Sequence, residues 1–202
     1  MNKSSASLIR YTLLIALLVV LLAGCARQPK FELNNVQGHL PDLAFELTSD
    51  EGKSVDAADF KGKVALLYFG YTHCPDVCPL TLTHLHVVMQ KLGAAAKDAR
   101  ILFVSVDPAR DTPAVLHAYA HAFDPHIVGL TGEASTIEAL AKRYRAVFNR
   151  ESPKVSGGNY EVIHSSAIYI FDRAGHARLI ATPIDSLDAM THDLKMLLGE
   201  SA

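Results

Sequence analysis

Two cysteines, Cys74 and Cys78, are the residues of this sequence with the clearest capacity for chemistry. They lie four positions apart in a polar loop that also contains Pro75 and ends at Pro79, between an apolar run and an expected helix. The free N–H groups at a helix N-terminus favour a thiolate over a thiol, and residues one helical turn apart can converge on one point. The pair can therefore form a reversible disulfide or bind a thiophilic metal ion. The alternative, that both cysteines are ordinary residues of the buried core, is less favoured because the loop around them is polar.

A metal site at this pair needs a further ligand, and imidazole is the usual partner of thiolates around copper or zinc. The chain has ten histidines. His164 is the main candidate because it precedes an expected strand at 166–171, although the residues alone also allow an ordinary strand-edge position. His73 should point away if the two sulfurs converge, and His117 and His121 are interpreted as solvent-exposed. Two thiolates with one histidine would suit Cu(I), which is a soft ion.

The elements expected around these residues alternate between strands and helices along the chain. Such alternation predicts an α/β fold with a mixed central sheet and helices on both faces. The clearest strand is 63–69, a continuous apolar run that is typical of a strand buried on both faces. A short strand is expected between the second and third helices. Further strands are expected at 45–48, 54–55, 101–106, 166–171 and 177–180. Helices are expected to start near residues 79, 113, 135 and 187.

Two of the helix starts carry recognisable capping signals. Thr112 followed by Pro113 is typical of an N-cap residue and a first helical position. Residues 135–138 match a capping box, in which two side chains each accept a hydrogen bond from the backbone of the other. The face of the helix after Pro113 that is expected to pack inward consists of Val115, Tyr119 and Ala122.

Residues 1–24 are predicted to be a lipoprotein signal peptide. Lys3 and Arg10 form a short positive segment, and an apolar run follows at 13–23. The run ends in Leu-Ala-Gly before Cys25, which resembles the bacterial lipobox, so the Cys25 thiol is expected to carry a lipid. An uncleaved anchor with a buried Cys25 is the alternative. Both interpretations tether the rest of the chain to a membrane outside the cytoplasm, and neither distinguishes an inner from an outer membrane.

The remaining chain is predicted to be a linker followed by one domain. Residues 25–39 are polar and unpatterned, which is typical of a membrane-proximal linker, and the domain would occupy 40–202. The composition is that of a globular protein, with 50% hydrophobic and 20% charged residues. A net charge of −2 without a basic cluster argues against nucleic-acid binding. Three cysteines are too few for a disulfide scaffold.

The loop that carries the two cysteines resembles a known motif. Its sequence at 69–79, Phe-Gly-Tyr-Thr-His-Cys-Pro-Asp-Val-Cys-Pro, closely resembles that of the Sco/SenC family of copper chaperones, which help to assemble cytochrome c oxidase. Three further segments resemble later motifs of the family in the same order, at 105–113, at 129–132, and at 162–165 followed by Tyr169. The resemblance covers most of the chain, from about residue 40 to the end.

The resemblance implies a thioredoxin-like fold in which Cys74, Cys78 and His164 are the ligands of copper, as Cu(I), Cu(II) or both. It also implies delivery of that copper to the copper centre of cytochrome c oxidase subunit II. Members of the family commonly have aspartate directly before the ligand histidine, whereas this chain has Ile163. A carboxylate at that position could orient the imidazole, so the departure bears on copper affinity and redox tuning rather than on the ligand set.

The same two cysteines support a second function, a thiol–disulfide reductase that keeps the recipient's cysteines reduced. Cys74 would attack, Cys78 would resolve, and a thioredoxin-like reductant would restore the dithiol. A peroxidase of related fold, in which Arg110 would have to activate the peroxide, and a redox or copper sensor are weaker alternatives. The sequence thus leaves open whether the chain is an enzyme. His164 separates the two main functions, because only copper binding requires it.

Overall fold

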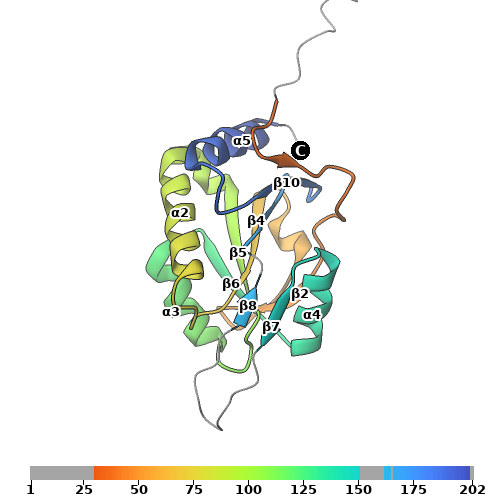
Figure 1. The fold of residues 1–202 in the computed structure, drawn as a ribbon, viewed down its shortest axis with the longest axis vertical. Coiled ribbons are helices and arrows are strands. Elements are labelled where there is room, and N and C mark those ends of the chain that lie inside the picture. Colours follow the sequence, from red (N-terminus) through yellow and green to blue (C-terminus); the bar gives the residue numbers. More distant parts are fainter. Residues whose placement is uncertain (1–29, 151–161, 165, 201–202) are drawn as a thin grey trace, which may run out of the picture. The chain divides into compact units, whose positions relative to one another are not determined.

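The fold is built on a mixed sheet of eight strands, seen in Figure 1. A computed structural model describes residues 30–150, 162–164 and 166–200. Across the sheet the order is β1 (Asn34–Asn35), β10 (Ala177–Ala181), β9 (Ile168–Phe171), β4 (Val64–Gly70), β5 (Ala99–Ser105), β6 (Ile127–Thr131), β2 (Glu46–Ser49) and β3 (Ser54–Asp56). Strands β4, β5 and β6 are parallel, and the others pair antiparallel with their neighbours. The carboxyl ends of the three parallel strands therefore share one edge of the sheet.

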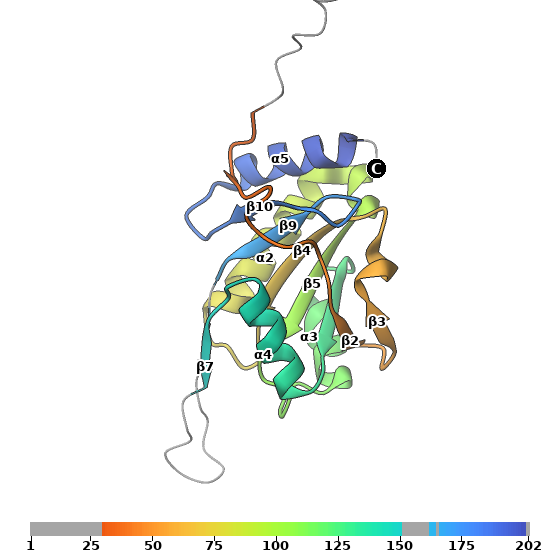
Figure 2. The same ribbon diagram turned by 90° about the vertical axis from the view of Figure 1, so that its right-hand side faces the viewer.

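Helices cover both faces of this sheet, as Figures 1 and 2 show together. On one face lie α2 (Val77–Leu92) and α3 (Pro113–Phe123), and α4 (Ala134–Arg143) lies on the other. The last helix, α5 (Leu187–Gly199), packs on α2. Every residue of β4 is buried, because the strand is central and covered on both sides. The predicted α/β architecture is confirmed. Two short 3-10 helices, η1 (Ala57–Phe60) and η2 (Gly93–Asp98), complete the connections.

Of the two predicted capping signals, the N-cap at Thr112 is confirmed and the capping box at 135–138 is wrong, although a helix does start near residue 135. Helix α3 begins at Pro113, and the Thr112 hydroxyl accepts a hydrogen bond from the Val115 N–H at 3.4 Å. Helix α4 begins at Ala134, with Glu133 at the N-cap position and no capping bond from its side chain. Residue 135 is therefore already inside the first helical turn, where it cannot adopt the extended backbone of an N-cap residue.

The buried face of α3 differs from the expected one by one residue. Leu116 and Ala120 are fully buried, whereas Val115 is 38% exposed and Tyr119 is only partly buried. The helix packs on β6, where a side chain at Gly129 would meet the Leu116 Cβ at 3.0 Å. The missing side chain of Gly129 lets Leu116 approach the strand closely, and this contact sets the rotation of the helix.

The segment 31–39, which the sequence analysis assigned to a linker, packs on the domain. Strand β1 pairs with β10 at the sheet edge. The backbone N–H groups of Glu32 and Leu33 donate to the buried Asp193 carboxyl group at 2.9 and 2.8 Å. The predicted signal peptide and Cys25 lie outside the described residues. None of the helices in the described part of the chain combines the length and apolar character needed to cross a bilayer.

We expect Thr112→Ala to lower the free energy of unfolding by about 1 kcal/mol, because it removes the N-cap hydrogen bond of α3. Thr83→Ala is the matched control, since Thr83 is exposed inside α2, where alanine is the better helix former. Urea denaturation of both variants measures the difference. Equal stability of the two variants would contradict the capping role.

Candidate functional site

The two cysteines lie where β4 ends and α2 begins. Cys78 is in the first turn of α2 and is fully buried, whereas Cys74 lies in the preceding loop and is partly exposed. The Cys78 backbone N–H donates to the Cys74 sulfur at 3.4 Å. The expected convergence is thus present, but it does not come from a shared helical turn, because the helix begins only at Val77. The loop instead folds back so that the Cys74 sulfur meets the helix N-terminus.

The Cys78 sulfur is enclosed by apolar and aromatic groups. The Tyr68 hydroxyl donates to it at 3.6 Å. Burial, with a smaller contribution from the neighbouring Cys74, raises the pKa of the Cys78 thiol to about 12. Hydrogen bonds from the Tyr71 backbone and from Tyr68 offset part of this rise. Cys78 therefore keeps its proton at neutral pH until something replaces that proton.

Gly70 provides the space that this sulfur occupies. A Cβ at this position would lie 2.9 Å from the Cys78 sulfur and 2.6 Å from a ring carbon of Phe103. Both distances are below van der Waals contact, so any side chain at this position would displace the sulfur or the ring. The glycine is therefore required for close packing of Cys78 against the end of β4.

A buried carboxyl group, that of Asp111, holds the cysteine loop in place. Its Oδ1 accepts from the Thr72 hydroxyl at 2.6 Å, and its Oδ2 accepts from the Thr72 backbone N–H at 3.0 Å. The same Oδ2 also accepts from the Ser105 hydroxyl at 2.6 Å. Because Thr72 precedes Cys74 by two residues and Ser105 ends β5, this one side chain joins the loops that follow two neighbouring parallel strands.

A second set of contacts supports the same loop from the 105–113 segment. The Val106 N–H donates to the Gly70 carbonyl at 2.8 Å. The Arg110 guanidinium pairs with Asp107 and lies 5.8 Å from the centre of the buried Tyr71 ring. From the sequence, Arg110 was considered only as a group that could activate peroxide, and no role was predicted for Asp111. The available signal was that Asp111 follows β5, a strand parallel to β4. The carboxyl ends of neighbouring parallel strands lie side by side, so Asp111 could be expected near the cysteine loop.

The backbone of His164 lies in β8 (Val162–His164), which pairs with β7 (Phe148–Arg150). The chain then enters β9, whose first residue, Ile168, pairs with Tyr68 near the end of β4. His164 is therefore carried toward the end of the sheet where the cysteine loop starts. The orientation of its side chain lies outside the described part of the structure.

The other histidines named by the sequence analysis have identifiable contacts. The His73 ring lies 3.0 Å from the Thr72 hydroxyl and 3.8 Å from Asp111, on the side of the carboxyl network, as expected. His117 and His121 are about half exposed, yet both contact the buried Asp50. The interpretation of these two as merely solvent-exposed residues is therefore incomplete.

Comparison with known proteins gives the family. Residues 35–199 match the family described as SCO1/SenC. The chain belongs to the SCO1/SenC family. The mitochondrial SCO2 homolog of Bos taurus is 41% identical over 133 residues, which are 65% of this chain and 50% of the bovine protein. The matched part of the chain spans between 37% and 75% of the length of such curated relatives, and about half of the bovine protein.

Solved structures of the family have the same fold. Bradyrhizobium japonicum ScoI with copper bound superimposes with a TM-score of 0.70 at 37% identity, over 77% of this chain and 98% of that chain. BsSco, a member of the Sco family of cytochrome c oxidase assembly proteins in which a disulfide switch was identified, has a TM-score of 0.62 at 26% identity, over 85% and 98%. The predicted thioredoxin-like α/β fold is confirmed.

We expect iodoacetamide to modify Cys74 at least about tenfold faster than Cys78 in the metal-free reduced protein. Cys74 is accessible, whereas Cys78 is buried and its raised pKa keeps it as the unreactive thiol. The Cys78 rate should still be rising with pH at about pH 10, because its pKa is about 12. Peptide mass spectrometry over time measures both sites. Faster modification of Cys78 would contradict the geometry.

We expect Asp111→Asn to lower the free energy of unfolding by about 1–3 kcal/mol and to speed the alkylation of Cys74. An amide would place an N–H group against one of the hydroxyl or N–H donors of Thr72 and Ser105, which leaves a buried donor unpaired. Asp185→Asn, which alters a partly exposed aspartate after β10, is a control for the charge change. Unchanged Cys74 alkylation in Asp111→Asn would show that the network does not position the loop.

Proposed function

We propose that this chain binds copper through Cys74, Cys78 and His164 and delivers it to subunit II of cytochrome c oxidase during assembly of the enzyme. The observation that carries the proposal is the pairing of a partly exposed Cys74 sulfur with the buried Cys78 at a helix N-terminus. Membership in the SCO1/SenC family and the copper-bound structures of relatives support it.

The two sulfurs would divide the task of holding and releasing copper. Thiolates are soft ligands that suit Cu(I), and the ion would replace the proton that Cys78 otherwise keeps because of its burial. Cys74 lies at the surface, so a thiolate of the recipient could reach the copper there. Transfer would then pass through an intermediate in which donor and recipient share the ion, with the Cys74 bond broken before the Cys78 bond.

His164 would complete the site. Its position four residues before Ile168, which pairs with Tyr68 near the end of β4, supports this role, because the Tyr68 hydroxyl contacts the Cys78 sulfur. A neutral imidazole would complete the coordination of copper without adding a further negative charge to that of the two thiolates. Ile163, which directly precedes His164, offers no carboxylate to orient the ring.

We also propose that the chain acts outside the cytoplasm, on the periplasmic side of a bacterial membrane, as a lipoprotein anchored through Cys25. The support is in the sequence, where a positive segment and a short apolar run precede a lipobox-like cysteine. Only residues 25–30 would then separate the membrane from the segment that packs on the domain. An oxidase subunit that receives copper on the same side would then be within reach.

A thiol–disulfide reductase is the second candidate, because the asymmetry of the two cysteines suits this function as well. Cys74 could attack a recipient disulfide, because it is accessible and accepts a hydrogen bond from the helix N-terminus. Cys78 would then displace the recipient thiol and form the Cys74–Cys78 disulfide. Two electrons pass to the recipient in this exchange, and an external dithiol of the thioredoxin type would restore the reduced pair.

We expect His164→Ala to weaken Cu(I) binding by at least about 100-fold, which exceeds the loss typical of groups outside the ligand set. His73→Ala is the matched control, because His73 adjoins Cys74 but faces Thr72 and Asp111. Competition with a Cu(I)-specific chelator measures the affinity of the reduced protein, and oxidase assembly in a strain that carries each variant measures delivery.

The same variants distinguish the two candidate functions. Loss of copper binding and of oxidase assembly in His164→Ala, with disulfide exchange retained, would support delivery. Oxidase assembly that survives in His164→Ala despite lost copper binding would overturn delivery and favour the reductase. A larger loss of Cu(I) affinity in His73→Ala than in His164→Ala would show that His73, rather than His164, is the third ligand.

A further inference from the structure

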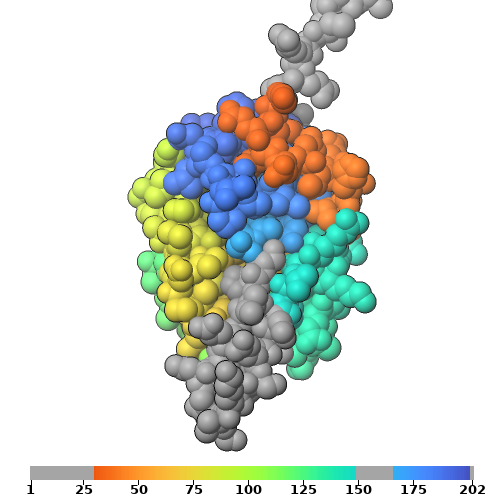
Figure 3. Space-filling model, in the orientation of Figure 1, coloured from red at the N-terminus to blue at the C-terminus, as the bar shows by residue number. Residues whose placement is uncertain are grey.

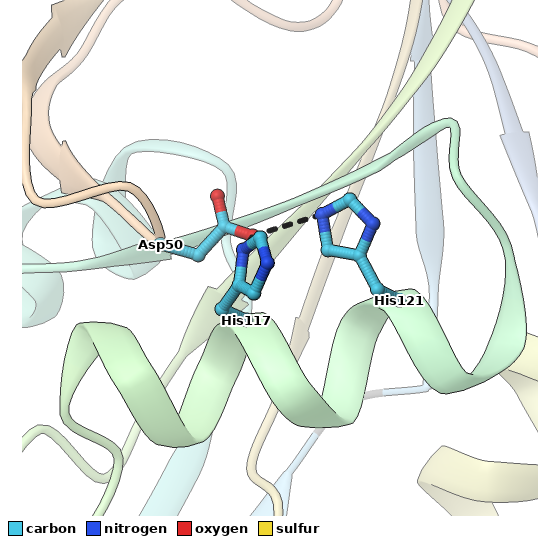
Figure 4. A group of neighbouring side chains, drawn as sticks. All are labelled: Asp50, His117 and His121. Carbon is cyan, nitrogen blue, oxygen red and sulfur yellow. Dashed lines mark ion pairs between the residues drawn. The ribbon is translucent and has the colours of Figure 1, made fainter.

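Three side chains converge along one side of α3, next to its buried stripe. Asp50 directly follows β2 in the turn that leads to β3, and His117 and His121 lie on successive turns of α3. Figure 4 shows both rings rising from the helix toward the Asp50 carboxyl group. One ligand atom from each residue lies within 4.8 Å of the other two. These residues are distant in sequence, so only the tertiary fold brings them together.

The distances in this cluster fit a shared metal ion better than direct hydrogen bonds. The His117 Nδ1 lies 3.3 Å and the His121 Nε2 lies 3.4 Å from the same oxygen, Asp50 Oδ2. Hydrogen bonds between such groups are normally about 2.7–3.2 Å long. In tetrahedral coordination with metal–ligand bonds of about 2.0–2.1 Å, neighbouring ligand atoms lie about 3.3–3.4 Å apart.

The Asp50 backbone is held against β6, and the carboxyl oxygen that faces the rings lacks a hydrogen bond. Asp50 is 7% exposed, and its Oδ2 is buried without a hydrogen-bond partner. Its backbone N–H donates to the Gly129 carbonyl at 2.7 Å, and a side chain at Gly129 would meet the Asp50 Cβ at 3.1 Å. A buried unpaired carboxyl oxygen is costly, and a bound cation would satisfy it.

Protonation of the two histidines is the competing explanation for the cluster. The ring centres of His117 and His121 are 4.3 Å apart, so two imidazolium cations would repel each other strongly. Neutral imidazoles that share one divalent ion avoid this repulsion. Glu51, which is exposed and paired with Lys53, adds a further carboxylate beside the cluster.

We propose that Asp50, His117 and His121 form a second metal site, which takes a divalent first-row transition ion such as Zn²⁺ or Cu²⁺. Two imidazoles and one carboxylate are borderline and hard ligands, which suit these ions rather than Cu(I). Both histidines are about half exposed, so water would fill the remaining coordination position. The site uses none of the residues of the cysteine centre, and bound metal would fasten α3 to the β2–β3 turn.

The experiment uses the full-length chain with all three cysteines replaced (Cys25→Ser, Cys74→Ser and Cys78→Ser), so that thiolates do not compete for the metal. Zn²⁺ is titrated against a chromophoric chelator, and the same protein is loaded with Cu²⁺ for electron paramagnetic resonance. His117→Ala, His121→Ala and Asp50→Asn are compared in this background. His176→Ala is the matched control, because His176 also pairs with an aspartate, Asp42, but without a second histidine.

We expect one equivalent of Zn²⁺ to bind and to raise the unfolding temperature. His117→Ala and His121→Ala should each weaken binding at least about tenfold, whereas His176→Ala should leave it unchanged. The Cu²⁺ spectrum should show nitrogen coupling that either histidine variant reduces. A dissociation constant weaker than about 100 μM, or an affinity unaffected by both histidine variants, would overturn the proposal. Because both histidines are exposed, these two variants test the site even if Asp50→Asn unfolds the protein.

Discussion

The cysteine loop has little regular structure of its own, and the buried Asp111 carboxyl group is the constraint that fixes it. Three hydrogen bonds from Thr72 and Ser105 end on this one side chain, which lies between the loops after β4 and β5. Buried polar groups stabilise a single conformation only when each is paired. The position of Cys74, two residues after Thr72, therefore depends on a residue far along the chain that touches neither sulfur in the described contacts.

The same sheet edge makes the two thiols chemically unequal. Cys78 is enclosed at the end of β4, and its burial stabilises the protonated form. Cys74 lies at the surface and accepts a hydrogen bond from the helix N-terminus. An anchoring sulfur and an accessible sulfur are what both copper transfer and disulfide exchange require. The geometry of the dithiol alone therefore supports two functions. A histidine ligand distinguishes them, because only copper binding requires it.

Helix α3 lies between two groups of potential ligands. Its partly buried Tyr119 stacks near Phe103, and a charge on either thiol would raise the pKa of Tyr119 further above the effect of burial. Its outer face directs His117 and His121 toward Asp50. The soft sulfur pair and the imidazole–carboxylate cluster therefore share one supporting element while they differ in ligand chemistry, so each can select a different ion.

The sequence by itself determined the α/β class, the buried β4 strand, the start of α3 and the importance of the two cysteines. These features follow from local composition and spacing, and the cysteine motif with its ordered companions indicated the family. Only the tertiary structure decided the rotation of α3, the role of Asp111 and the meeting of Asp50 with two histidines. Each of these depends on contacts between segments distant in the chain, such as the close approach of Leu116 and Asp50 over Gly129. Spacing within one segment carries no information about such contacts.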